Sequence, residues 1–137
     1  MIVQTQTTSF KAELYQGVHD LLTDTIKIAL YTASANLDQT TTVYTTLNEV
    51  VASGYTAGGE VMTGVTLGTS GYTAYVNFAN VSWAASLTAR CALIYNASKG
   101  NKAVAVLDFG SDKTTNGSFT ITMPANTPTS ALIRSST

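Results

Sequence analysis

Much of the chain alternates hydrophobic and polar residues with a period of two, which is the pattern of β-strands with one buried face. In residues 25–32, Ile26, Ile28 and Leu30 alternate with Lys27, Ala29 and Tyr31. The longest apolar run, 87–95, predicts a central strand that forms a hairpin with the strand after the turn at 96–101. We expect seven or eight strands, the others falling within 61–67, 72–80, 102–109, 119–123 and 131–133.

One segment near the N-terminus departs from this period and predicts a helix. Ser9 is the expected N-cap, and apolar residues follow it at spacings of three or four positions. The polar, β-favouring residues 23–25 predict the end of this helix. Its apolar face consists of Phe10, Leu14, Val18, Leu21 and Leu22.

Regularly spaced strands with polar turns and a single helix predict a mainly β fold. The expected architecture is an antiparallel β-sandwich, of jelly-roll or Greek-key form, with one short N-terminal α-helix. Residues 33–46 are too polar for a core strand, 54–59 form a glycine-rich turn, and 110–117 form a polar loop. Residues 1–8 are polar and unpatterned, so we expect an arm that becomes ordered only on a neighbour, followed by one domain over 9–137.

The composition narrows the possible partners. Of the 137 residues, 45% are hydrophobic and only 11% charged, which excludes a disordered chain. The net charge of -1 offers no electrostatic surface for a phosphate backbone, so we expect no direct nucleic-acid partner. No apolar run is long enough for a membrane span and no signal peptide is recognisable, which predicts an unprocessed protein made in the cytoplasm. With 24 Thr and 12 Ser residues, the surface is largely neutral and suits a protein bound to copies of itself or to a larger assembly.

Candidate catalytic chemistry is sparse. His19 and Asp20 are adjacent, but neighbouring residues on a helix point in different directions. Cys91 lies within an apolar strand, where a free thiol packs as a small hydrophobic group. Three aspartates, Asp38, Asp108 and Asp112, do not have the spacing of a calcium loop. We therefore expect no enzyme, and no catalytic, cofactor-binding or metal-binding residues.

The tyrosines are the remaining feature, because aromatic side chains on a neutral surface stack on sugars or anchor protein interfaces. Five tyrosines fall on polar strand positions or in loops, and we expect one or two of them to contact a partner. These interface candidates are Tyr15, Tyr31, Tyr44, Tyr55 and Tyr75.

Several short sequence blocks together resemble one known family. They are Ser9–Lys11, Gly17–Asp20, Asp24–Thr32, Asn48–Val50, Gly54–Gly59, Ala92–Asn96 and Ala103–Gly110. In this order and spacing they resemble a family of small tailed-bacteriophage virion structural proteins, and residues 51–53 depart from its more glycine-rich link. The resemblance implies a virion role, without catalytic or binding residues to transfer.

The resemblance and the low charge lead to one expected function and one alternative. The expected function is a capsid decoration or cement protein that binds the outer surface of the major capsid shell as a homo-oligomer and bridges capsomers. Its partners would be the major capsid protein and further copies of itself, on the virion exterior. The alternative is a head- or tail-fibre module that binds a host receptor or glycan near Tyr44 or Tyr72.

Overall fold

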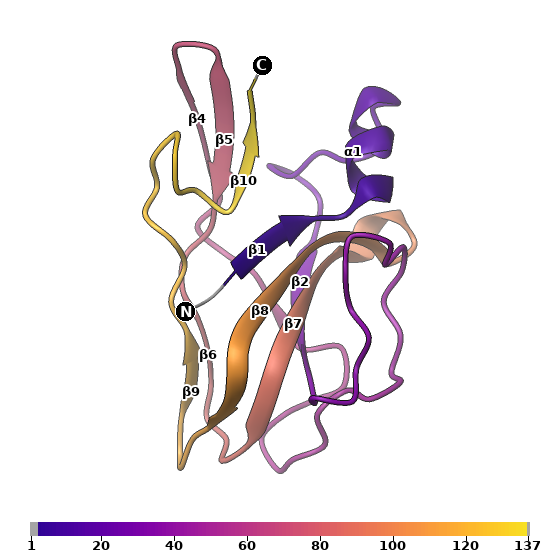
Figure 1. Cartoon of the computed structure of the whole chain (residues 1–137), viewed down its shortest axis with the longest axis vertical. Helices are drawn as coiled ribbons and strands as arrows, with labels where there is room; N and C mark the ends of the chain where they lie inside the picture. Colours follow the sequence, from indigo (N-terminus) through magenta and orange to yellow (C-terminus); the bar gives the residue numbers. More distant parts are fainter. Residues whose placement is uncertain (1–2, 137) are drawn as a thin grey trace.

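The computed structural model describes residues 3–136 and is mainly β, as predicted, with antiparallel strand pairs and one α-helix (Figure 1). Strand formation follows the period-two alternation of the sequence. The elements are β1 (Val3–Gln6), α1 (Thr8–Tyr15), β2 (Ile26–Tyr31), β3 (Glu60–Val61), β4 (Thr66–Ser70), β5 (Thr73–Asn77), β6 (Val81–Trp83), β7 (Thr88–Asn96), a 3-10 turn (Ala97–Lys99), β8 (Lys102–Thr114), β9 (Phe119–Ile121) and β10 (Ile133–Ser135).

The strands form one large sheet and two small ones. The large sheet has the order β1-β8-β7-β2-β3, and the small sheets have the orders β10-β5-β4 and β6-β9. The expected central hairpin is present: β7 lies between β2 and β8, and all of these pairs are antiparallel. Its turn is possible because Gly100 and Asn101 both have positive φ angles, of 69° and 60°.

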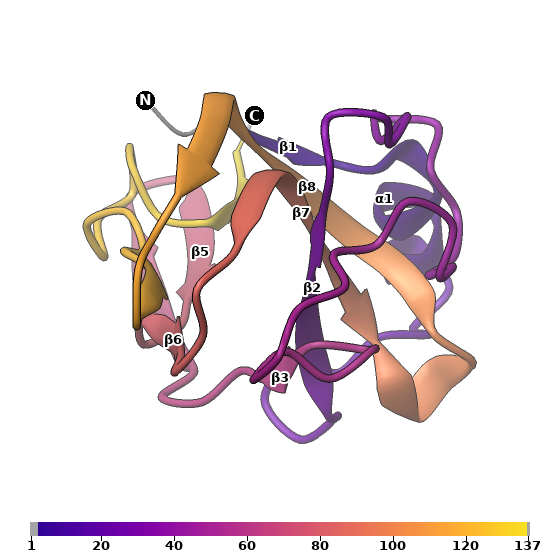
Figure 2. The same ribbon diagram turned by 90° about the horizontal axis from the view of Figure 1, so that it is seen from below.

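The main core lies between the large sheet and the small sheets, in a layered, sandwich-like arrangement (Figure 2). The large sheet contributes Ile28, Leu30 and Ile94, and the β6–β9 pair contributes Trp83 and Phe119. The rings of Trp83 and Phe119 pack edge to face with centroids 6.1 Å apart. Burial of these side chains provides the main stabilisation of the fold.

The second face of the large sheet is also buried, which the alternation in β2 did not predict. Ala29 and Tyr31 of β2 pack with Leu93 and Tyr95 of β7 in a second cluster. Residues 32–59, here called the covering loop, run across this face and cover it with Ala35, Leu37 and Tyr44. The covering loop contains no strand longer than an isolated bridge, as the polar composition of residues 33–46 predicts.

The helix is shorter than predicted and begins earlier. Its N-cap is Thr7 rather than Ser9, because the Thr7 hydroxyl accepts a hydrogen bond from the backbone N–H of Phe10 at 3.2 Å. It ends at Tyr15 because Gly17 has φ +70° and Val18 N–H donates to Glu13 C=O, which together form a glycine C-terminal cap. Of the predicted apolar face, only Phe10 is fully buried.

The expected N-terminal arm is corrected by the structure. Residues 1 and 2 lie outside the described residues, but β1 pairs with β8 in the register Val3↔Asp108 to Gln6↔Ala105. The Gln6 amide donates to Arg134 C=O at 2.8 Å, and that of Gln4 donates to the backbone of residues 130–131. The polar side chains that suggested an arm therefore bind the C-terminal segment of the same domain.

The described residues form ten strands rather than the expected seven or eight, and several boundaries differ from the prediction. The range 61–67 is divided between β3 and β4, and β6 lies outside every predicted range. β8 continues through 110–114, which the polar composition assigned to a loop, because Thr88↔Thr114 and Ala89↔Lys113 extend the pairing with β7. A register shift between Ala89 and Cys91 interrupts this pairing, and Gly110 in β8 has φ +82°. The last strand, expected at 131–133, occupies 133–135 instead.

Candidate functional site

The five candidate tyrosines occupy different environments. Tyr15 is 94% exposed at the end of α1 and is available for contact with a partner. Tyr44 and Tyr75 are half-buried. Tyr31 and Tyr55 are buried, so they cannot act as surface contacts and this part of the expectation is wrong. Their sequence positions look polar, but Tyr31 lies beneath the covering loop beside Tyr44, whereas Tyr55 belongs to that loop and packs into the main core, 6.1 Å from the ring of Trp83.

A buried carboxylate organises the tyrosines of the covering loop. Glu49 Oε2 accepts hydrogen bonds from the Tyr55 hydroxyl at 2.5 Å and from Gly58 N–H at 2.8 Å. Glu49 Oε1 accepts from the Tyr44 hydroxyl at 2.6 Å. The Tyr95 hydroxyl of β7 donates to Gly58 C=O at 2.6 Å and so connects this cluster to the sheet. These bonds hold the covering loop in one conformation on the large sheet.

The same cluster changes the acidity of the tyrosines. Burial raises the pKa of Tyr55 and Tyr44 well above the ordinary value, and the hydrogen bond to the Glu49 carboxylate raises it further. Burial, followed by the negative charge of Glu49, raises the pKa of Tyr95 to about 12. The hydroxyls therefore remain protonated donors at neutral pH, which suits a structural role.

The outer side of the covering loop exposes apolar side chains. Val51 is 97% exposed and Leu47 is 74% exposed, and Val43 is also exposed. Leu47 and Val43 line a shallow hollow of about 350 Å³ together with Leu37 and the polar side chains of Asn36 and nearby threonines. A loop that is held rigidly and presents apolar groups loses little entropy on binding, which favours a role in protein contact.

A second exposed apolar region is the β4–β5 hairpin, which extends at the upper end of the molecule in Figure 1. Tyr72 at its turn is 91% exposed, and Leu67 on β4 is 56% exposed. Gly71, the other turn residue, has φ +57°. The aromatic tip and the exposed outer strand make this hairpin a further candidate contact surface.

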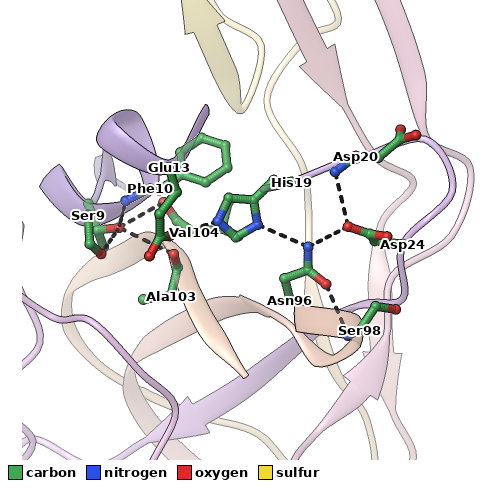
Figure 3. Close-up of polar contacts among 11 residues, drawn as sticks. Ser9, Phe10, Glu13, His19, Asp20, Asp24, Asn96, Ser98, Ala103 and Val104 are labelled. Atoms are coloured by element: carbon green, nitrogen blue, oxygen red, sulfur yellow. Dashed lines mark hydrogen bonds and ion pairs between the residues drawn. The ribbon is translucent and has the colours of Figure 1, made fainter. Parts of the chain in front are cut away.

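His19 does not pair with Asp20 and belongs instead to a polar network (Figure 3). The Asn96 side-chain amide donates to His19 Nδ1 at 3.0 Å, and His19 Nε2 donates to Glu13 Oε1 at 2.8 Å. The same Asn96 nitrogen donates to Asp24 Oδ2 at 2.8 Å. Both ring nitrogens are engaged and the His19 side chain is fully buried, so the network connects α1 to the end of β7 without access for a substrate.

Asp24 completes this network at the surface. The Asn96 side chain, and then the Asp20 backbone N–H, hold the pKa of the Asp24 carboxyl below its ordinary value. Lys99 adds an ion pair at 3.6 Å. The carboxylate thus joins the segment before β2 to the 3-10 turn after β7.

Cys91 lies in β7 and is buried in the second cluster with Leu93 and Tyr95, as its apolar strand predicted. Burial, and then the negative charge of Asp108, raises the pKa of its thiol to about 11. The thiol is therefore protonated at neutral pH and is a poor nucleophile.

The remaining acidic candidates serve local structure. Asp38 accepts hydrogen bonds from the backbone N–H and hydroxyl of Thr40, whereas Asp108 pairs with Arg90 at 3.3 Å and accepts from Gly110 N–H. Within residues 3–136, no three His, Cys, Asp or Glu side chains are grouped in a way that could hold a metal ion. In the same range, no helix is long and apolar enough to cross a membrane.

Two features of these surfaces were missed from the sequence. Glu49 belongs to no catalytic or metal-binding motif, but an acid followed by apolar residues in a chain with few charges is a signal of a buried, hydrogen-bonded carboxylate. The exposure of Leu47 and Val51 has no signal in the sequence, because their surroundings in a loop depend on the tertiary structure. Comparison of the chain with protein families, with curated proteins and with solved structures finds no match.

Proposed function

We propose that this protein is a bacteriophage capsid decoration or cement protein that binds the outer surface of the major capsid shell and bridges neighbouring capsomers. The observation that carries the proposal is the covering loop, hydrogen-bonded to the buried Glu49 carboxylate, with Leu47 and Val51 exposed on it. Exposed apolar side chains of this kind can form the buried centre of a protein interface when a partner covers them. The resemblance of the sequence blocks to small virion proteins supports the same assignment.

The low charge fits the mechanism that this function requires. Copies placed side by side on a shell repel each other if their surfaces carry one sign of charge, and this chain carries a net charge of only -1. Each contact with the shell can be weak, because the symmetry of the shell repeats it many times and the contacts reinforce one another. Bridging then resists the outward pressure of packaged DNA.

The first test is the copy number of the chain in purified virions, measured by quantitative mass spectrometry against the major capsid protein. A ratio within a small factor of one to one is expected for a protein spread over the shell. A few copies to a few dozen would assign the chain to the vertices, neck or tail and contradict the proposal.

A binding test addresses the covering loop directly. The double variant Leu47→Ser, Val51→Ser is expected to bind undecorated shells more weakly than the wild type, because it removes the exposed apolar contacts. Leu22→Ser is the matched control, since Leu22 is also an exposed leucine but lies outside the covering loop. Equal loss in both variants, or loss in neither, would contradict a shell contact through Leu47 and Val51.

A second candidate function is binding of a host glycan by a head- or tail-fibre module. The observation that favours it is the hollow of the covering loop, where Asn36, Asn48 and the threonines 40–42 offer amides and hydroxyls beside Leu37. Tyr44 is not available for this role, because its ring stacks on Tyr95 at 4.6 Å and its hydroxyl binds Glu49. Retention of the protein on a specific glycan, lost in Asn36→Ala, would favour this function.

A further inference from the structure

β4 is an exposed outer strand without the usual protection. It pairs with β5 on one side and forms the outer edge of the three-stranded sheet, and no other strand of residues 3–136 pairs with it. Four of its five residues are exposed and the fifth, Gly68, is half-buried. A strand that is open on both faces and along one edge gains little from burial in a single chain.

The composition of this region is equally unusual. Between Glu60 and Arg90 the sequence contains no charged residue and no proline. Natural proteins normally protect an exposed edge strand with lysine, proline or an inward charge, because its free backbone groups pair readily with another strand. The hairpin has none of these devices, so its edge is open to pairing with another strand of the same neutral character.

The turn determines which backbone groups are free. Gly71 and Tyr72 form a two-residue turn with a positive φ at the first position, the arrangement of a type II′ hairpin. In such a hairpin Ser70 and Thr73 exchange hydrogen bonds, and the pattern then alternates along the strands. Thr66, Gly68 and Ser70 therefore direct their N–H and C=O groups toward β5, whereas Leu67 and Thr69 direct theirs outward.

We propose that two copies of this chain pair through β4, antiparallel, about a two-fold axis at Gly68. Leu67 of each copy then lies opposite Thr69 of the other, and each of these two pairs exchanges both of its outward hydrogen bonds. Gly68 lies opposite the Gly68 of the second copy. The result is a continuous six-stranded sheet across the dimer.

The residues at the axis suit this register. Gly68 meets its copy as a pair without hydrogen bonds, in which the two Cα atoms approach to about 4.5 Å. Two glycines at this pair leave the face above the axis free of their own side chains. The space above Gly68 is occupied by Tyr75 of β5, since a Cβ atom on Gly68 would lie only 2.5 Å from Tyr75 Cζ. The axis therefore brings the two Tyr75 rings together over the paired glycines, which adds an aromatic contact.

The β4 dimer would be the way in which copies of the protein associate on the capsid, and in that respect the inference rests on the proposed function. Its test uses the purified 137-residue chain without phage components. A failure of β4 pairing therefore leaves the virion assignment standing, and a failure of the copy-number test leaves β4 pairing standing.

Two charge-designed double variants test the register. Leu67→Lys with Thr69→Lys places lysine opposite lysine in both pairs, so the dimer is expected to dissociate. Leu67→Glu with Thr69→Lys places glutamate opposite lysine at the same two positions, so the dimer is expected to persist. Both variants leave the β5-facing hydrogen bonds of β4 intact, and circular dichroism with thermal melting verifies that each one folds.

The measurement is mass by sedimentation equilibrium from micromolar to millimolar concentration. The wild type and the Glu/Lys variant are expected at twice the 14.4 kDa chain mass or an even multiple, and the Lys/Lys variant at half of the wild-type mass. A monomeric wild type, or dissociation of both variants, would overturn pairing about Gly68. A Lys/Lys variant that keeps the wild-type mass would also overturn it, because the copies would then associate through another surface.

Discussion

The buried Glu49 cluster predicts a graded loss of stability when its carboxylate is altered. Glu49→Ala leaves the Tyr55 hydroxyl and Gly58 N–H without their acceptor in a buried site. Each unsatisfied buried donor costs about 1–3 kcal/mol, so we expect a loss of roughly 3–4 kcal/mol in the free energy of unfolding. Glu49→Gln keeps one acceptor oxygen but loses the charge, and we expect a loss of about 1–2 kcal/mol.

Urea unfolding provides the assay, because Trp83 is the single tryptophan and is buried in the main core. At roughly 3–5 °C per kcal/mol for a chain of this size, Glu49→Ala also lowers Tm by about 10–20 °C. Glu60→Gln is the matched control, since Glu60 is an exposed carboxylate on β3, and we expect a change within about 0.5 kcal/mol.

The order of the three variants is the decisive result. If Glu49→Ala and Glu60→Gln unfold at the same urea concentration, the cluster contributes no net stability. The inference that it holds the covering loop rigid would then fail. If Glu49→Gln lowers the free energy of unfolding as much as Glu49→Ala does, the charge of the carboxylate, rather than the number of acceptor oxygens, determines the stability of the cluster.

Three further predictions follow from the structure. Removal of residues 1–6 deletes β1, so we expect the free energy of unfolding to fall by an amount on the order of 2–4 kcal/mol and Tm, measured by calorimetry, to fall with it. An unchanged Tm would instead support the prediction of an N-terminal arm outside the domain. The free energy of unfolding is expected to fall as pH rises above about 10, because Tyr95 and its neighbours ionise more readily in the unfolded chain than in the folded one, where their pKa is raised. Urea melts from about pH 8 to 11 measure this fall, and Tyr95→Phe is expected to make it smaller. The Cys91 thiol, with its pKa raised to about 11, is expected to resist a thiol reagent at pH 8 until the chain is unfolded in urea, and rapid labelling of the folded protein would contradict its burial.

Local patterns were sufficient for the elements whose burial follows from their own sequence. The apolar run at 87–95 has to be buried, so β7 lies at the centre of the sheet. Gly100 and Asn101 after it adopt positive φ angles and permit the tight turn to β8. The sequence has only one segment with helical spacing, and the other apolar residues alternate or form short runs, which predicts a mainly β fold. The apolar setting of Cys91 likewise predicts its burial.

The interaction surfaces depended on partners far apart in sequence. Whether Tyr31 or Tyr55 is exposed depends on the covering loop, and that loop is positioned by Glu49 and Gly58. A polar N-terminal segment resembles an arm until Gln4 and Gln6 meet the backbone of residues 130–134. The contacts of Tyr95 with Gly58 and of Gln6 with Arg134 join residues that no short window contains, and even the nearby Glu49 and Tyr55 show no periodic spacing, so periodicity cannot predict them.

The sequence by itself determined the strand-rich class, the central hairpin and the neutral character of the surface, because these depend on local hydrophobic spacing and on composition. Only the tertiary structure decided which tyrosines are buried, that β1 belongs to the sheet, and that β4 remains an open edge. Those outcomes depend on which backbone and side-chain groups find partners once the chain is packed.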